Sequence, residues 1–289
     1  MSDAPADIRG AFLARRAELE AAYPGMLGTG WPARARTIAL VGGALAIYVV
    51  GLHVLEFSPA VIVHGLWRLA DIAGLMLPPS PGSWTRFLLY LNALGQTLSI
   101  ALLGTLTAAV LAVPLGFLAA RNVMTNRVLH VLTRRGLDTI RSIDTLIWAL
   151  IWINVVGLGP FAGALAIASA DLAAFAKLMS ESIEAADHRP GEGVAAAGGG
   201  HMARVRFAIL PQVLPIFASQ VLYFFESNTR SATIIGVVGA GGIGLWLSEA
   251  IRVLEWQETS FLILMVLVTV AAIDAVSRRL RAAIIGRRG

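Results

Sequence analysis

Two long stretches without any charged side chain set the strongest limit on how this chain can fold. One runs from Phe87 to Ala120 and the other from Thr145 to Ala170. About 20 consecutive apolar residues are enough for a helix to cross the hydrocarbon core of a bilayer. Both stretches exceed that length, and a buried helix of a soluble protein needs far fewer apolar residues in a row. We therefore expect an all-α, polytopic membrane protein.

The composition agrees with this class. Charged residues make up 14% of the 289 residues and mean hydropathy is +0.73, whereas roughly a quarter of the residues of a soluble domain are charged. The chain has no Cys, which excludes disulfides, thiolate metal sites and cysteine nucleophiles. No metal-ligand set and no nucleophile–base pair stands out, so we expect no catalytic residues, no metal and no cofactor.

Breaks in the apolar pattern divide the chain into about six expected spans, at 37–55, 87–120, 137–156, 161–183, 205–235 and 256–276. The second of these spans, 87–120, would be roughly 50 Å long as one helix. It must therefore tilt, kink near Pro114 or run past the membrane. We expect three regions: an amphipathic segment at 1–36, a first span with an external interfacial helix at 37–86, and a transmembrane domain at 87–289. The first apolar run begins only near Thr37, which does not fit a secretory signal.

The basic residues fix the expected orientation. Four of the 23 Lys and Arg residues fall in outer connections, namely Arg68, Arg86, Arg230 and Arg252, and the remaining 19 fall on the other side. Cytoplasmic connections carry the excess of Lys and Arg in membrane proteins. We therefore expect both termini in the cytoplasm. The basic net charge then reflects topology, and we expect no nucleic-acid partner.

The cytoplasmic connection 184–211 contains the most informative motif. A short helix at 191–197 is expected to end at three consecutive glycines, which permit left-handed backbone. A second short helix, 201–210, would lead to a proline. Such a helix–turn–helix offers a rigid knob to a groove in a soluble partner. Its anchors are Glu192, Gly198, Leu210 and Pro211.

The spacing of these anchors resembles the cytoplasmic coupling motif of ATP-binding-cassette import permeases. In that pattern, Glu-Ala-Ala is followed after three residues by Gly, and after nine more by Ile-x-Leu-Pro. Here Gly193 and Val194 replace the two alanines, and Ala208 replaces the isoleucine. A literal Glu-Ala-Ala begins at Glu184, but its glycine position would be Pro190.

Other segments look like phosphonate import permeases within this family, chiefly 226–244, with 141–150, 157–163 and 177–181. The resemblance implies a type I importer permease in the bacterial inner membrane that transports phosphonates or related oxyanions. It implies a second permease copy, two cytosolic ATP-binding subunits on the coupling loops and an external substrate-binding protein. Phosphite, hypophosphite or methionine are rival substrates. No Walker Gly-x-x-x-x-Gly-Lys-Ser/Thr occurs, so ATP hydrolysis is expected on a partner.

Ionisable and polar residues inside spans are candidates for the translocation path, because charge in a membrane usually faces a bundle interior or a water-filled cavity. The path candidates are Asp171, Glu226, Asn228 and Arg230. Glu226 and Arg230 lie four positions apart, so they can also pair with each other. Two further pairs, Lys177 with Glu181 and Arg141 with Asp144, are expected to be structural.

A glycine-rich stretch at the outer face is expected to gate the path or to allow close packing. Its glycines are Gly239, Gly241, Gly242 and Gly244. They also satisfy G-x-G-x-x-G, but a dinucleotide site requires a βαβ unit, and an apolar span follows instead. The alternative from another class is a stand-alone secondary transporter or channel. Such a protein would need no coupling knob, and Asp171 would carry protons.

Overall fold

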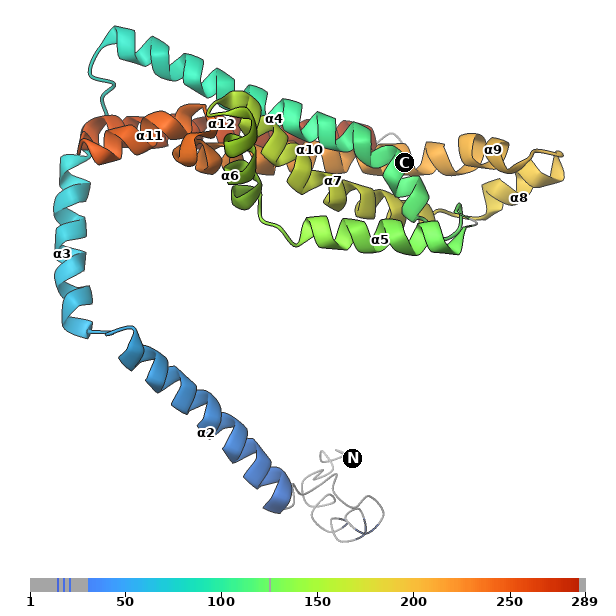
Figure 1. The fold of residues 1–289 in the computed structure, drawn as a ribbon, viewed down its shortest axis with the longest axis horizontal. Coiled ribbons are helices and arrows are strands. Elements are labelled where there is room, and N and C mark those ends of the chain that lie inside the picture. The colour runs from blue at the N-terminus through green and yellow to red at the C-terminus, as the bar shows by residue number, and fades with distance from the viewer. Residues whose placement is uncertain (1–14, 16–17, 19–20, 22–30, 125, 286–289) are drawn as a thin grey trace, which may run out of the picture. The chain divides into compact units, whose positions relative to one another are not determined.

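The computed structural model describes residues 31–124 and 126–285, together with 15, 18 and 21. Most of the expected amphipathic segment at 1–36 therefore lies outside the described residues. The described chain is helical and contains no strand, which confirms the all-α class. Its helices (Figure 1) are α2 (Trp31–Val54), α3 (Pro59–Leu75), α4 (Trp84–Ala119), α5 (Arg127–Arg141), α6 (Thr145–Val156), α7 (Pro160–Glu184), α8 (Arg189–Ala196), α9 (His201–Arg204), η1 (Val205–Ile209), α10 (Leu210–Ile235), η2 (Gly236–Ala240), α11 (Ile243–Arg252) and α12 (Trp256–Ile285).

Within the described residues, five helical stretches are long and apolar enough to cross a membrane, at 34–54, 84–119, 160–184, 201–240 and 256–284. A sixth span exists if α5 and α6 are taken together. The helix α3, with 17 residues, is not among them, and its interfacial position stays a prediction. The helix α4 continues through Pro114 over 36 residues.

The third expected span, 137–156, is wrong as one continuous helix. The helices α5 and α6 meet at an angle of 89°. The Asp144 carboxylate accepts a hydrogen bond from the Leu146 N–H at 2.8 Å and so caps the start of α6, because the first N–H groups of a helix lack internal partners. This cap takes the place of the expected ion pair between Asp144 and Arg141.

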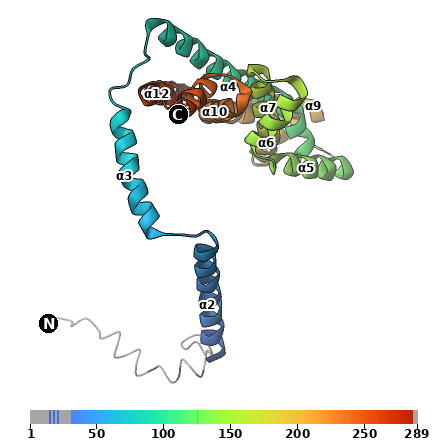
Figure 2. The same ribbon diagram turned by 60° about the vertical axis from the view of Figure 1, so that its left-hand side comes forward.

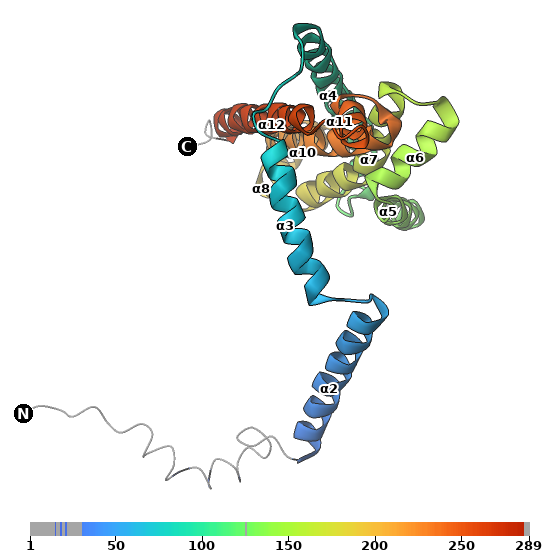
Figure 3. The ribbon, with the colours of Figure 1, turned by 90° about the vertical axis from the view of Figure 1, so that its left-hand side faces the viewer.

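The helices α4 and α7 run parallel (Figure 1) and form the most extensive helix–helix contact of the bundle. A Cβ atom added to Gly104 would lie 2.7 Å from the Cβ of Ile167, and one added to Gly116 would lie 2.6 Å from the Cβ of Met179. Small residues at such positions let helix backbones approach closely inside a membrane. In Figures 1 and 2, α10 lies beside this pair, and in Figure 3 it lies between α7 and α12.

The expected second short helix does not end at Pro211. Instead α9, the π-helix η1, α10 and η2 form one helical stretch from His201 to Ala240. The Leu210 N–H bonds to the carbonyl of Val205, five positions back, so the turn before the proline is wide. Proline is tolerated in the first turn of a regular helix because no N–H is needed there. The segment before Leu210 is thereby joined to α10 without an intervening loop.

Candidate coupling and translocation sites

The helices α8 and α9 form a hairpin that extends beyond the ends of α5 and α7 (Figure 1). Its turn depends on Gly198, which has a φ of +81°. The Gly198 N–H bonds to the Ala195 carbonyl and the Gly199 N–H to the Val194 carbonyl, both at 2.9 Å. This pair of bonds is the Schellman arrangement, which satisfies the last carbonyls of a helix and favours glycine at the left-handed position.

The predicted coupling residues occupy two places on this hairpin. Glu192 is exposed in the first turn of α8, at the edge of a cleft of about 400 Å³. Gly198 forms the tip, and a Cβ there would meet no atom within 4 Å. Leu210 and Pro211 lie at the base, where α10 begins. The structure thus brings the four anchors to the tip and base of one protruding unit.

The base of the hairpin is fastened by side chains that the sequence motif does not include. The Gln212 amide accepts a hydrogen bond from the Asp187 N–H at 3.0 Å and donates one to the Asp187 carbonyl at 3.2 Å. Glu184 pairs with Arg134 at 3.2 Å and accepts the Arg121 N–H at 2.9 Å. The acid of the literal Glu-Ala-Ala therefore anchors the end of α7 rather than belonging to the hairpin.

Three helices meet at the side-chain amide of Asn228, inside the bundle. This amide donates to Thr105 of α4 at 2.8 Å and to Asp171 of α7. All three side chains are buried. Buried polar groups require such partners because their desolvation is otherwise uncompensated. Asp171 and Asn228, predicted as path residues, therefore join helices in this structure.

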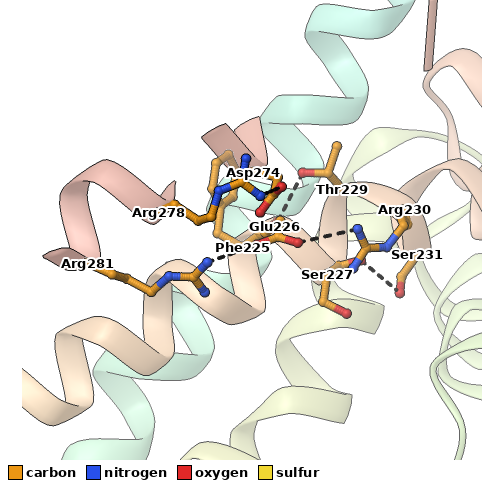
Figure 4. A network of polar contacts seen from close by, with 9 residues as sticks. All are labelled: Phe225, Glu226, Ser227, Thr229, Arg230, Ser231, Asp274, Arg278 and Arg281. Carbon is orange, nitrogen blue, oxygen red and sulfur yellow. Dashed lines mark hydrogen bonds and ion pairs between the residues drawn. The ribbon is translucent and has the colours of Figure 1, made fainter. Parts of the chain in front are cut away.

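Glu226 lies between two arginines (Figure 4). It contacts Arg230 on its own helix at 3.5 Å and Arg281 on α12 at 3.4 Å. The contact with Arg230 is the pair expected from their spacing. Arg281 was missed, because no local pattern links residues 55 positions apart. Glu226 is buried, whereas the Arg230 side chain is 50% exposed.

The exposed face of α10 carries several polar residues between Gln220 and Ser231. Residues on this face lie at helical spacing and are exposed or partly exposed, namely Gln220, Tyr223, Ser227, Arg230 and Ser231. Polar side chains in a membrane avoid lipid and line a bundle interior or a water-filled cavity. This polar face of α10 includes only one of the four predicted path residues, Arg230.

The expected pair between Lys177 and Glu181 is wrong. Lys177 of α7 instead approaches Asp138 of α5 at 3.6 Å. The two helices pack against each other, so the lysine reaches an acid that lies on a neighbouring helix rather than on its own.

The glycines of the segment 239–242 pack tightly against the turn before α7 and against α4. The Gly159 N–H donates to the Gly239 carbonyl at 3.0 Å. A Cβ on Gly241 would lie 2.8 Å from the Pro160 nitrogen, and Gly242 lies against Thr97. The Thr97 hydroxyl in turn accepts the Ile243 N–H at 2.8 Å. Positive φ angles at Gly239, Gly241 and Gly242 shape this turn, and Gly244 abuts the Thr233 carbonyl.

A family model described as the inner membrane component of binding-protein-dependent transport systems matches residues 112–288, more than half of the chain. The chain belongs to this family. It is therefore the multi-pass, membrane-spanning permease subunit of an ATP-driven importer rather than an enzyme. Membership implies a substrate-binding protein and an ATPase as partners.

Relatives of this permease carry names that mention phosphorus compounds. The phosphite transport system permease protein PtxC of Stutzerimonas stutzeri is 34% identical over 256 residues, which cover 88% of this chain and 90% of PtxC. PhnE2 of Escherichia coli K12, named as the permease of a cryptic phosphonate transport system, is 49% identical over 105 residues. Those residues cover 36% of this chain and 86% of PhnE2.

A solved structure supports the permease fold. An inward-facing form of the MetNI methionine ABC transporter is similar with a TM-score of 0.61, over 70% of this chain and 99% of that one. The identity is 19%, so this likeness concerns the fold alone. The predicted fold of a type I importer permease is confirmed.

Proposed function

We propose that this permease imports phosphonates or related phosphorus oxyanions such as phosphite, working as a symmetric pair with two cytosolic ATP-binding subunits. The observation that carries the proposal is the protruding hairpin with Glu192 and Gly198 at the motif spacing. Its second arm continues as one helical stretch into α10, which carries Arg230. A partner that moves the hairpin would thereby act directly on a helix of the proposed path.

Charge supports an oxyanion as substrate. The cluster in Figure 4 contains two acids, Glu226 and Asp274, and three arginines, Arg230, Arg278 and Arg281. Asp274 of α12 pairs with Arg278. Glu226 is shared between Arg230 and Arg281, so it does not neutralise both. Arg230, half exposed, keeps donors available. A guanidinium binds the oxygens of phosphonate or phosphite through paired, charge-assisted hydrogen bonds.

We assign the proposed path to the polar face of α10. Ser227 and Ser231 flank Arg230 on this face, and Tyr223 lies one turn nearer the hairpin. One chain supplies half of the lining and a second copy supplies the other half. Two of the three other predicted path residues, Asp171 and Asn228, hold α4, α7 and α10 together beside it.

The proposed orientation places the hairpin and both termini in the cytoplasm. The bias of Lys and Arg residues supports this orientation, since four of the 23 fall on the opposite side. The outer glycine turn then faces the substrate-binding protein. We propose that Gly239, Gly241, Gly242 and Gly244 form a closely packed external seal of the path.

Substitution of Gly198 tests the coupling role. Val is strongly disfavoured at a positive φ, so Gly198→Val should distort the turn while leaving the membrane helices intact. Gly200→Val is the matched control, because Gly200 is in the same turn, has an ordinary φ of −74° and has no atom within 4 Å of its Cβ position. We expect Gly198→Val to reduce co-purification of the ATPase and ATP hydrolysis stimulated by loaded binding protein.

Two outcomes would contradict the proposal. If Gly198→Val retained full ATPase binding, stimulated hydrolysis and uptake, the hairpin would not be the coupling element. If Gly200→Val reduced ATPase co-purification and stimulated hydrolysis as much as Gly198→Val, the effect would reflect added bulk in the loop rather than the glycine-dependent turn. Uptake assays with phosphonate, phosphite and methionine on the wild type separate the substrate assignment from the coupling assignment.

A further inference from the structure

The connection between α4 and α5 borders a cleft of about 390 Å³ that the proposed transport function does not use. Its lining consists of Arg121, Met124, Arg127, His130 and Val131. Two of these side chains are guanidinium groups, one is an imidazole and two are apolar. No acidic side chain lines the cleft.

The basic groups of this cleft lack partners in the described part of the chain. Neither Arg121 nor Arg127 forms an ion pair there through its side chain. His130 is 9% exposed, and its Nδ1 is buried without a hydrogen-bond partner. The remaining basic residue nearby, Arg134, is already paired with Glu184. A buried donor or acceptor without a partner is costly, and this imidazole lies in the wall of the cleft beside the two unpaired guanidinium groups.

We propose that this cleft binds a phosphate group, with Arg121 and Arg127 as its charged donors and the His130 imidazole beside them. Guanidinium groups match phosphate oxygens in geometry as well as in charge. Because Met124 and Val131 are apolar, the phosphate group could belong to either of two ligands. One is the headgroup of an anionic phospholipid, whose chain would lie along the apolar side, and the other is free inorganic phosphate.

A phosphate group bound in this cleft would also influence the hairpin, because the α4–α5 connection is hydrogen-bonded to the end of α7. The Arg121 N–H bonds to Glu184 at the end of α7, and the neighbouring Asn122 donates to the Ile183 carbonyl at 2.8 Å. Asn122 also lines the cleft beside Glu192. A bound phosphate group would therefore fix the connection that supports the hairpin base, in addition to pairing with the two guanidinium groups.

The test uses the full-length chain in phosphatidylcholine nanodiscs, without and with added phosphatidylglycerol, and in a separate titration with inorganic phosphate at constant ionic strength. Native mass spectrometry counts retained phosphatidylglycerol, and thermal unfolding reports phosphate binding. We expect Arg121→Gln/Arg127→Gln to weaken binding of the active probe by about tenfold or more, as for loss of charge-assisted hydrogen bonds. His130→Gln should weaken it less.

The control for each single variant is Arg135→Gln, which also removes one positive charge, at a side chain of α5 that is 81% exposed and outside the cleft. Retention of phosphatidylglycerol alone identifies a lipid headgroup as the ligand, and stabilisation by inorganic phosphate alone identifies a soluble ligand. Equal losses in the control and the double variant, or no loss in either, would overturn the site. If the double variant does not fold, the two single variants decide by the same criteria.

Binding must also persist in the complex with the ATPase. Occlusion of the cleft on assembly would mean that a protein surface covers these residues, and it would overturn the proposal. The test measures binding rather than uptake, so its failure leaves the proposed transport function unaffected.

Discussion

Asp171 and Asn228 are hydrogen-bonded to each other across the contact between α7 and α10, although 57 positions separate them in the sequence. The same amide reaches Thr105 on α4. A carboxylate near the middle of a membrane helix is therefore held by a fixed neighbour. This arrangement gives Asp171 a structural role that does not require proton transfer.

Substitutions of this pair should separate structural from proton-carrying roles. Asp171→Asn keeps an acceptor for the amide, so we expect normal uptake and a melting temperature near that of the wild type. Asn228→Leu leaves a buried carboxylate unpaired and should cost about 1–3 kcal/mol in the free energy of unfolding. Ser99→Ala is the control, because Ser99 is exposed on α4 and its hydroxyl bonds only to the Gly95 carbonyl of the same helix. A folded Asp171→Asn protein without uptake would instead support a proton-coupled secondary transporter.

Arg230 and Arg281 share Glu226 but should respond differently to substitution. Arg230→Gln removes the half-exposed donor proposed to contact the anion, and we expect about tenfold slower uptake with assembly intact. Arg281→Gln removes a largely buried partner and should lower the melting temperature. Arg252→Gln, an exposed change at the end of α11, is the control. Normal uptake by the Arg230 variant would contradict a role in anion transport and leave Arg230 only its structural ion pair with Glu226.

The turn that contains Gly241 should tolerate no added methyl group at this position. Its φ is +83°, and a Cβ would lie 2.8 Å from the Pro160 nitrogen. Overpacking of this kind costs about 1–3 kcal/mol, so Gly241→Ala should unfold at lower temperature. Gly95→Ala adds the same methyl group where no atom lies within 4 Å. Equal melting temperatures in the two variants would show that the turn is loosely packed.

The contact between α4 and α7 allows a similar comparison inside the membrane. Gly116→Ala should destabilise the protein, because the new Cβ would fall within 2.6 Å of the Met179 Cβ. Gly136→Ala, where no atom lies within 4 Å, should be neutral or stabilising, since Ala favours helix by about 1 kcal/mol over Gly. Thermal unfolding of the purified variants measures whether each substitution lowers or raises the melting temperature. Destabilisation of both by the same amount would contradict the close contact.

The length of the apolar runs was sufficient to predict the class of fold, because membrane helices need little else to be recognised. The break between α5 and α6 was not predicted, since the residues 142–144 include neither Gly nor Pro. A signal was nevertheless present, because Asp144 directly precedes an apolar run, as an N-cap residue does.

The candidate hairpin was predictable because glycine spacing is a local property of the sequence. Its continuity with α10 was not, since a proline ordinarily suggests an interruption and the wide turn before Pro211 has no sequence signal that we recognise. The partners of Asn228, Glu226 and Lys177 also depend on which helices pack together. For that reason, residues predicted to line a path proved to include residues that hold helices in place.

The two glycine contacts between α4 and α7 have a consequence for motion. They lie 12 positions apart on α4 and equally far apart on α7, so both must be satisfied in the same register. Sliding by one helical turn would bring Ile100 or Ala108 opposite Ile167, where even a single methyl group is too large. These helices are therefore expected to travel together as a rigid body during transport. Relative movement must then occur at other boundaries, such as the one between α10 and α12, where charged side chains can exchange partners.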